Sequence, residues 1–335
     1  MSLPGPTTQT PGTAGTEALD VSVVIPTRGR HELLRRAIAS AIGQEPRPRE
    51  IVVVADGPDP GLADVLGGVE ASGLRLVELP EAAGAQAARN AGVAAATSTW
   101  LALLDDDDEW RPAKLRRQLA AAAAAACPEP IVTCAVEVRS PRGIYVMPRR
   151  YPAPNEPVSE WLTVRHGLLR GGFVQTSSLF ASRELFRRIP FDPGMTRLQD
   201  LDWLLRAVHG GACFVPVPEP LSIWHADEDR PRVTHGADWQ QLLHWAQDHR
   251  DLFTDRAYAA FLLGAVASIA ARGDRRGFGT LLREARRRGQ PRPLDYLTYL
   301  QIWIVPPGLR GRLRDRWLRA VVKAPKDSRP GRRSA

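Results

Sequence analysis

Apolar and polar residues follow two alternating patterns along the first third of the chain. Runs of about six mostly aliphatic residues end at proline or aspartate, which is typical of buried strands. Between these runs, apolar residues recur every three or four positions, the spacing of a helix with one buried face. Strands are predicted over 21–26, 50–55, 74–79 and 99–104, and helices over 31–44, 62–68 and 82–96. This alternation indicates right-handed βαβ units and a mostly parallel sheet with flanking helices.

The rest of the chain carries fewer strand signals and then becomes helical. The pattern predicts a helix over 114–126, an antiparallel pair over 131–138 and 144–147, a proline-rich loop over 148–157, a strand over 173–180, and helices through Arg188 and over 198–208. From Asp238 onward the pattern is helical, with a break near Gly273 and a stop at Pro306.

These elements suggest one α/β domain with a helical extension. We expect a disordered leader at 1–19, a domain at 20–235 with halves at 20–110 and 111–235, a helical region at 236–323 and a disordered basic tail at 324–335. The leader lacks the basic start and apolar stretch of a secretion signal. Since no run of eighteen apolar residues occurs, the default expectation is a cytoplasmic protein.

The net charge of +8 is concentrated at one end of the chain. Residues 271–335 contain 18 Lys and Arg against 5 Asp and Glu, so the preceding part is acidic overall. A basic region of this kind suits an anionic membrane surface, although it is equally typical of a solvated helix face. We expect either peripheral contact with the inner face of the membrane or a homodimer contact through this region, and no nucleic-acid partner.

The three cysteines, Cys127, Cys134 and Cys213, are odd in number and lack the spacing of a metal site. We expect them to be incidental or buried thiols of a reducing compartment rather than disulfide partners or zinc ligands.

A run of carboxylates, Asp105 to Asp108, follows the fourth predicted strand directly. Adjacent aspartates repel one another and resist desolvation, so they need compensating positive charge at the edge of a core. An isolated acidic run is often a solvated turn, but the carboxyl ends of strands are where open α/β sheets bind ligands. Oxygen ligands of this kind suit Mg²⁺ or Mn²⁺.

Three further features lie in the same half of the chain. Residues 26–30 form a turn after the first strand whose hydroxyl, backbone and arginine groups could face a nucleotide. Asp56 follows the second strand, and Arg89 is a single cation in an alanine-rich helix. Taken singly, each has a structural alternative: a plain strand-to-helix turn, an Asp-Gly turn and an exposed arginine.

Together these motifs resemble those of the inverting family 2 glycosyltransferases, which have the GT-A fold. The resemblance covers about residues 21–225 and rests on the order of five motifs. These are Val21-Ser-Val-Val-Ile-Pro-Thr27, Val52-Val-Val-Ala-Asp-Gly57, Ala88-Arg-Asn-Ala-Gly92, Leu103-Leu-Asp-Asp-Asp-Asp108 and Gln199-Asp-Leu-Asp-Trp-Leu-Leu-Arg206.

The resemblance implies a metal-dependent enzyme that moves a sugar from a nucleoside-diphosphate sugar, most simply a UDP-sugar, to an acceptor hydroxyl. Such enzymes act in glycan, glycolipid or natural-product biosynthesis. It assigns Asp105 and Asp107 to a Mn²⁺ or Mg²⁺ ion. The residues implied in donor binding are Pro26, Thr27, Arg30, Asp56, Arg89, Asn90, Asp105 and Asp106.

The resemblance also assigns Asp200 as the general base, with Asp202 as the alternative. His225 and Arg232 lie where the family has a loop near the donor phosphates, and they are candidates for phosphate or metal contact. Two positions depart from the family pattern: Ala55 replaces the first of two aspartates, and Gln199 replaces a glutamate before the base.

Two other functions remain open from the sequence. A sugar nucleotidyltransferase also uses a parallel sheet and a carboxylate-held metal, but it would favour a longer, glycine-rich loop than residues 27–30 provide. The other alternative is a non-catalytic protein that binds nucleotide sugars.

Overall fold

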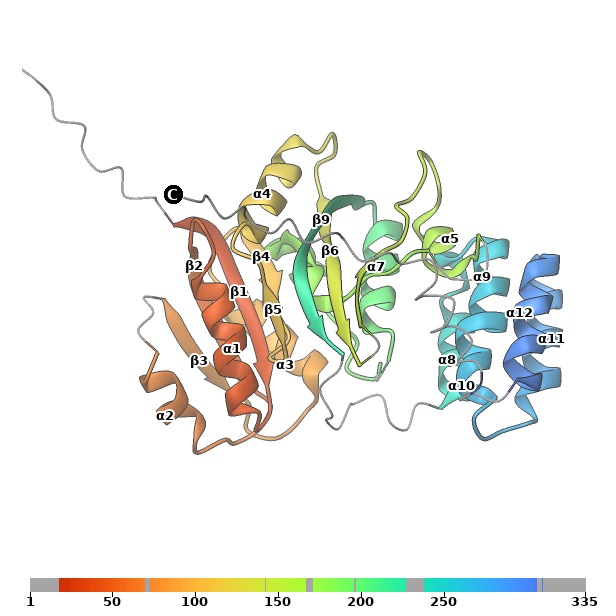
Figure 1. Cartoon of the computed structure of the whole chain (residues 1–335), viewed down its shortest axis with the longest axis horizontal. Coiled ribbons are helices and arrows are strands. Elements are labelled where there is room, and N and C mark those ends of the chain that lie inside the picture. Colours follow the sequence, from red (N-terminus) through yellow and green to blue (C-terminus); the bar gives the residue numbers. More distant parts are fainter. Residues whose placement is uncertain are drawn as a thin grey trace, which may run out of the picture.

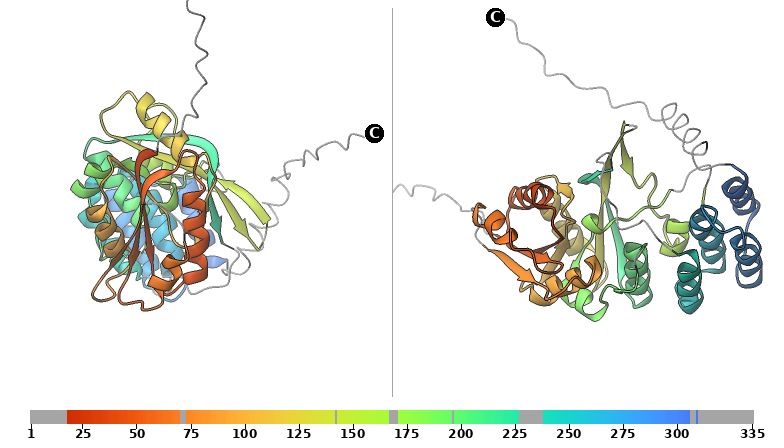
Figure 2. Two further views of the ribbon diagram at one scale, coloured as in Figure 1. Left: turned by 90° about the vertical axis from the view of Figure 1, so that its left-hand side faces the viewer. Right: turned by 90° about the horizontal axis from the view of Figure 1, so that it is seen from below.

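The computed structural model describes residues 18–69, 73–141, 143–166, 171–195, 197–226, 238–305 and residue 309. These residues form a nine-stranded sheet flanked by helices, with a further group of helices stacked at one end (Figures 1 and 2). The strand order is β3-β2-β1-β4-β8-β6-β9-β5, and β7 pairs with β6.

The first third of the chain folds as its apolar pattern predicts. The strands are β1 (Leu19–Thr27), β2 (Pro48–Ala55), β3 (Leu74–Glu78) and β4 (Trp100–Leu103), and they pair with one another in parallel. The connecting helices are α1 (His31–Ile42), α2 (Leu62–Gly67) and α3 (Ala85–Ala95). The central parts of β1, β2 and β4 are mostly apolar because helices cover both faces of the sheet, and alternate residues contact different helices. Val24 belongs to the same buried cluster as α3, whereas Val23 belongs to the cluster of α1.

Helix α3 approaches the sheet closely at Gly92. A Cβ atom at this position would lie 2.3 Å from Cγ1 of Val24 and 3.0 Å from Cγ2 of Val54, so no larger residue fits without displacement. Arg89 lies one turn earlier on the same helical face. The close packing therefore fixes the height of Arg89 above the carboxyl ends of the strands.

The second half of the chain extends the sheet with both pairing directions. Its elements are β5 (Asp108–Trp110), α4 (Lys114–Ala124), β6 (Pro130–Ser140), β7 (Gly143–Met147), α5 (Val158–Thr163), the 3₁₀ turn η1 (Thr176–Ser178), β8 (Phe180–Ser182), α6 (Arg183–Arg188), α7 (Gln199–His209) and β9 (Cys213–His225). The pairs β4–β8, β6–β8, β6–β7 and β5–β9 are antiparallel, and β6–β9 is parallel. The expected α/β fold is confirmed, and the sheet as a whole is mixed.

Three strand assignments differ from the prediction, one of them the short strand β5, which begins inside the acidic run. The predicted strand over 173–180 is absent except for its last residue, because the side chains of η1 and its neighbours form hydrogen bonds to carboxylates and local backbone groups. Only β8 pairs with the sheet there. Strand β9 was not predicted, since Pro216, Pro218 and Pro220 interrupt its apolar pattern, and its register shifts beside them.

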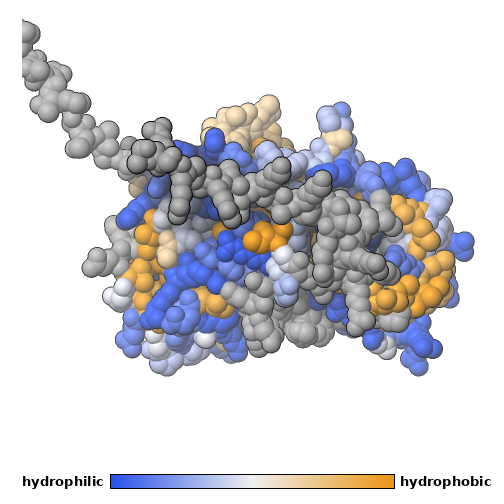
Figure 3. All heavy atoms as spheres, in the orientation of Figure 1, coloured by the Kyte–Doolittle hydropathy of each residue, from blue (hydrophilic) through white to orange (hydrophobic). Residues whose placement is uncertain are grey.

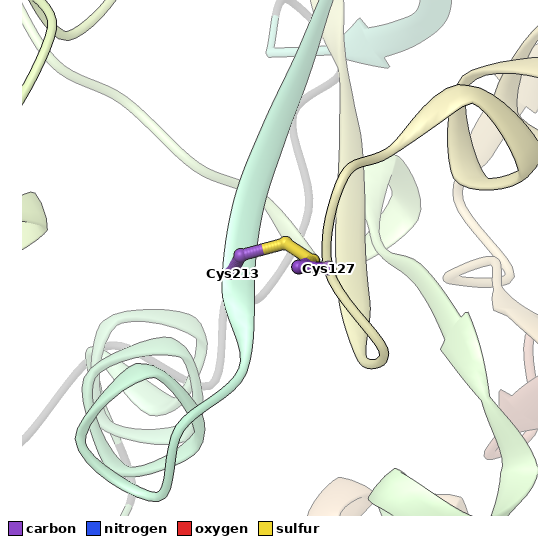
Figure 4. Close-up of a disulfide and its surroundings, with 2 residues drawn as sticks. All are labelled: Cys127 and Cys213. Carbon is purple, nitrogen blue, oxygen red and sulfur yellow. A yellow bond between two sulfur atoms is a disulfide. The ribbon is translucent and has the colours of Figure 1, made fainter.

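The cysteine prediction was wrong for two of the three residues. Cys127 and Cys213 form a disulfide with their Cα atoms 6.6 Å apart (Figure 4). Cys127 follows α4 and Cys213 begins β9, and the pairing of Pro130 with Cys213 brings these two points together. Their separation of 86 residues in sequence hid this proximity. Cys134 is a free, buried thiol.

The described residues from Trp239 to Val305 are mostly helical, as predicted, and the rest of the predicted helical region lies almost entirely outside the described residues. The described part forms α8 (Trp239–Asp248), the 3₁₀ turn η2 (Arg250–Leu252), α9 (Asp255–Ala260), the π-helical segment η3 (Phe261–Val266), α10 (Ala267–Ala270), α11 (Gly277–Arg288) and α12 (Pro293–Ile304). Buried side chains of α8 and η3 share one core with Trp203 of α7 and with Val24 and Val52 of the sheet. Within the described residues, no helix is both long and apolar enough to span a membrane.

Candidate active site

The acidic run lies at the carboxyl end of β4, where the ends of β1 and β2 also meet. Asp105, Asp107 and Asp108 each place one carboxylate oxygen within 4.8 Å of the others. The side chains of Asp105 and Asp107 are 23% and 19% exposed, whereas Asp108 is buried. Three hard oxygen donors thus converge at the edge of the sheet, a donor set that suits Mg²⁺ or Mn²⁺.

Asp106 points inward, toward the end of β1. Thr27 Oγ1 donates to Asp106 Oδ2 at 2.7 Å, and the Arg30 guanidinium lies 2.5 Å from Asp106 Oδ1 and 3.0 Å from Asp107 Oδ2. Burial raises the pKa of Asp106 to about 6, although Arg30 opposes this effect. Thr27 and Arg30, both predicted donor contacts, therefore hold the acidic run in this structure.

Asp108 is fixed by residues that the sequence reasoning missed. Gln175 Nε2 and Ser177 Oγ donate to Asp108 Oδ2 at 2.6 Å and 2.5 Å. Ser177 Oγ also accepts from the backbone N–H of Asp105 at 3.0 Å. The segment around η1 therefore supports two of the three clustered carboxylates.

Arg89 projects from α3 into the site and is 3% exposed. One of its terminal nitrogens donates to Asp105 Oδ1 at 2.6 Å, while Nε and the other terminal nitrogen have no hydrogen-bond partner among the described residues. Burial alone would lower the pKa of Arg89, but the charges of Asp105 and Asp200 raise it overall. A buried cation with unsatisfied N–H groups is suited to an anionic ligand.

Asp200 lies in the first turn of α7, close enough to Arg89 for their charges to interact. Its Oδ1 accepts a hydrogen bond from Thr176 Oγ1. Leu198, which caps the helix, has a left-handed φ of 59°, an uncommon conformation that is often found at functional sites. Burial raises the pKa of Asp200 to about 6, with Arg89 and Thr176 acting in the opposite direction. A carboxylate tuned toward neutral pH is suited to general-base work.

Asp202 and Asn90 are engaged in internal contacts. Asp202 is 1% exposed, pairs with Arg206 at 2.6 Å and accepts from Trp245 Nε1 at 3.1 Å. The Asn90 amide both donates to and accepts from the backbone of Phe191, at 2.8 Å and 2.9 Å. Asp202 thus joins α7 to α8, and Asn90 joins α3 to the segment before α7.

Asp56 follows β2 and holds the backbone of the residues directly before α3. Its Oδ1 accepts from the backbone N–H groups of Ala83 and Gly84 at 2.7 Å and 2.9 Å, and its Oδ2 lies 3.9 Å from exposed Arg28. Pro26 lies next to the last residue of β1, the strand that pairs with β2. These residues line the sheet edge beside the acidic run.

His225, the last residue of β9, lies beside the end of the acidic run, because β9 pairs with β5. His225 Nε2 lies 2.6 Å from Glu109 Oε1. Arg36 of α1, which the sequence reasoning also missed, donates to the Asp107 carbonyl at 3.0 Å and lies 3.4 Å from Glu109. Arg232, the other predicted phosphate contact, lies outside the described residues.

Residues 22–175, which contain the acidic run and Arg89, match the family model described as glycosyl transferase family 2. Residues 22–175 are a family 2 glycosyltransferase domain. This result confirms the resemblance inferred from the motifs, and it decides between a glycosyltransferase and a sugar nucleotidyltransferase in favour of the first.

Curated relatives of this glycosyltransferase extend the similarity beyond that domain. The chain is 27% identical over 254 residues to the amylovoran biosynthesis glycosyltransferase AmsB of Erwinia amylovora, which covers 72% of this chain and 83% of the relative. It is 26% identical over 270 residues to the putative colanic acid biosynthesis glycosyl transferase WcaA of Escherichia coli K12, covering 78% and 91%.

Solved structures share the fold. S. aureus TarS 1–349 in complex with UDP-GlcNAc has a TM-score of 0.55 and 15% identity, covering 90% of this chain and 88% of that chain. The mannosyltransferase PcManGT of Pyrobaculum calidifontis, in complex with GDP-Man and Mn²⁺, has a TM-score of 0.51 and 20% identity, covering 90% and 88%. The chain spans about half (53%) of the longer TarS chain. These likenesses confirm a GT-A-type fold.

Proposed function

We propose that this glycosyltransferase moves a sugar from a nucleoside-diphosphate sugar to an acceptor hydroxyl in polysaccharide biosynthesis, with inversion at the anomeric carbon. The observation that carries the proposal is the placement of buried Arg89 between the acidic run and Asp200. The proposal also draws on the structural neighbours, one in complex with UDP-GlcNAc and another in complex with GDP-Man and Mn²⁺, and on a relative named for amylovoran biosynthesis.

A divalent ion fits the carboxylate cluster. Asp105 and Asp107 are the proposed ligands, because both are partly exposed and lie with Asp108 in an oxygen-rich group. When bound, Mn²⁺ or Mg²⁺ would supply Lewis-acid stabilisation of the charge on the departing nucleoside diphosphate. Arg89, which pairs with Asp105, would supply positive charge beside the same diphosphate, and Asp56 and Pro26 would contact the nucleoside at the adjacent sheet edge.

Asp200 is the proposed general base. As the acceptor oxygen forms its bond to the anomeric carbon, the bond from that carbon to the phosphate oxygen breaks, and Asp200 takes the acceptor proton. A single displacement of this kind inverts the anomeric configuration. Asp200 is preferred over Asp202 because Arg206 and Trp245 enclose the Asp202 carboxylate.

Nucleotide binding tests the proposal directly. We expect UDP, titrated by calorimetry in the presence of MnCl₂, to bind at least about 10-fold more tightly than UDP with EDTA, because a bound ion offsets the repulsion between diphosphate and carboxylates. GDP and ADP titrated in parallel would identify the base. If none of the three nucleotides binds with Mn²⁺ present, the proposal is wrong.

An exposed apolar surface on helix α12 bears on the cellular location of the enzyme. Helix α12 buries Tyr299 and Ile302 but exposes Leu297, Leu300 and Ile304 by 61%, 45% and 73%. Figure 3 shows apolar residues gathered at this end of the molecule with hydrophilic residues around them. The neighbouring helix α11 lines a hollow with Gly279, Leu282, Arg283, Arg286 and Arg287. Because apolar side chains beside arginines suit anionic lipid surfaces, we propose that this face, the α12 face, rests on a membrane.

Vesicle flotation tests the α12 face. Wild type should float with vesicles that contain phosphatidylglycerol and not with pure phosphatidylcholine, and Ile304→Glu should abolish flotation. Ile144→Glu on β7 is the matched control, because Ile144 is 62% exposed and β7 pairs with β6 of the sheet rather than with the helical region. Equal flotation of all three proteins would overturn the proposal. A dimer in light scattering that Ile304→Glu dissociates, without flotation, would assign the face to a second copy instead.

A further inference from the structure

Through two adjacent side chains, the turn η1 contacts both the proposed base and the carboxylate cluster. Thr176 Oγ1 donates to Asp200, and Ser177 Oγ donates to Asp108 Oδ2 at 2.5 Å. A 3₁₀ turn has three residues per turn, so consecutive side chains point about 120° apart. One turn can therefore hold two carboxylates that lie on different sides of it. An extended strand could not set this angle, because its successive side chains point in opposite directions.

The turn itself is held rigidly. Its three residues are at most 1% exposed. Trp110 Nε1 donates to the Ser177 carbonyl at 2.8 Å, and Gln118 Nε2 donates to the Ser178 carbonyl at 2.8 Å. Gln118 is oriented in turn by buried Lys114, whose ammonium donates to Gln118 Oε1 at 2.6 Å. These contacts leave η1 little freedom to shift relative to the strands.

We infer that η1 sets the position of the base relative to the metal-binding carboxylates, with Thr176 as the positioning residue for Asp200 and Ser177 as the positioning residue for Asp108. This inference rests on the proposed role of Asp200 as the base. Neither hydroxyl needs to touch substrate for the role. Each acts through the carboxylate that it contacts.

The two hydroxyls should have separable effects. Asp200 is influenced by Arg89 from α3, by Asp105 after β4, and by the hydroxyl and backbone N–H of Thr176. A hydrogen bond to the charged carboxylate favours that form, so losing the hydroxyl should raise the pKa of Asp200. Asp108, in contrast, belongs to the cluster proposed to bind the ion, and losing Ser177 Oγ should weaken metal affinity.

The experiment compares Thr176→Val, Thr176→Ser and Ser177→Ala by UDP release from UDP-glucose, UDP-galactose and UDP-GlcNAc across pH. In wild type, kcat/KM should fall below pH about 6, because protonated Asp200 cannot accept a proton. Thr176→Val should lower kcat about 10-fold and move this acid limb to higher pH by about 0.5–1, with KM for the donor unchanged. Thr176→Ser, which keeps the hydroxyl, should restore both.

Ser177→Ala should instead raise the Mn²⁺ concentration for half-maximal activity by about 10-fold and leave the acid limb in place. Ser178→Ala is the matched control, since Ser178 Oγ donates to the carbonyl of Gln175, the residue before the turn, at 2.6 Å and, among the described residues, to neither carboxylate. An acid limb that Thr176→Val leaves unchanged, or that Ser178→Ala moves equally, overturns the inference. If Asp200→Asn retains wild-type turnover, the proposed base is wrong rather than its positioning.

Discussion

Asp200→Asn is expected to lower donor turnover by about 10²–10⁴-fold, the usual contribution of a general base. Asparagine keeps the shape of the side chain and can still accept from Thr176, but it cannot take a proton from the attacking hydroxyl. Binding of UDP with Mn²⁺ should stay within about 3-fold of wild type, because the change is made on the acceptor side of Arg89. UDP release and calorimetry measure the two quantities separately.

Asp202→Asn is the matched comparison, two residues further along α7. Removing the charge of buried Asp202 breaks its ion pair with Arg206 and weakens the hydrogen bond from Trp245, so we expect a lower Tm and a smaller loss of kcat than in Asp200→Asn. The opposite pattern, with normal turnover in Asp200→Asn and a selective loss of kcat in Asp202→Asn at an unchanged Tm, would move the base to Asp202.

The parts of the site that the sequence predicts are those attached to strand ends. Asp56 and Asp105 directly follow apolar runs whose direction and burial are evident from local pattern alone. In a parallel sheet the carboxyl ends of these strands meet at one edge, so their neighbours converge without any knowledge of the remaining contacts. Arg89 follows the same logic one step later, since α3 is amphipathic and Gly92 marks its close contact with the sheet.

The parts that the sequence did not predict depend on contacts between distant segments. Ser177 reaches Asp108 across 69 residues, and Gln175 reaches it across 67, while their local sequence has no period that marks a site. Arg36 is one of many arginines on helix surfaces, and only the pairing of β5 with β9 brings His225 to Glu109. The disulfide is hidden for the same reason, because the proximity of Cys127 to Cys213 arises from strand pairing.

Asp107→Ala is expected to have the largest effect on donor binding. Of the two proposed metal ligands, Asp107 has the less exposed side chain, at 19% against 23% for Asp105. Its carboxylate also pairs with Arg30 at 3.0 Å. Its removal deletes a ligand charge and should weaken Mn²⁺-dependent UDP binding by about 10² -fold or more, with turnover reduced at least as much. Calorimetry of UDP at several MnCl₂ concentrations provides the measurement.

Raising the Mn²⁺ concentration separates a ligand role from a purely structural one. If Asp107 binds the ion, excess Mn²⁺ should recover part of the lost UDP affinity, because a weakened site can still be filled by mass action. Asp64→Ala, an exposed carboxylate on α2, is the matched control and should bind UDP as wild type does. A variant Asp107→Ala with wild-type Mn²⁺ dependence would show that the ion, if it binds, is held elsewhere. Loss of affinity together with a large fall in Tm and no recovery would indicate instead that Asp107 mainly anchors Arg30.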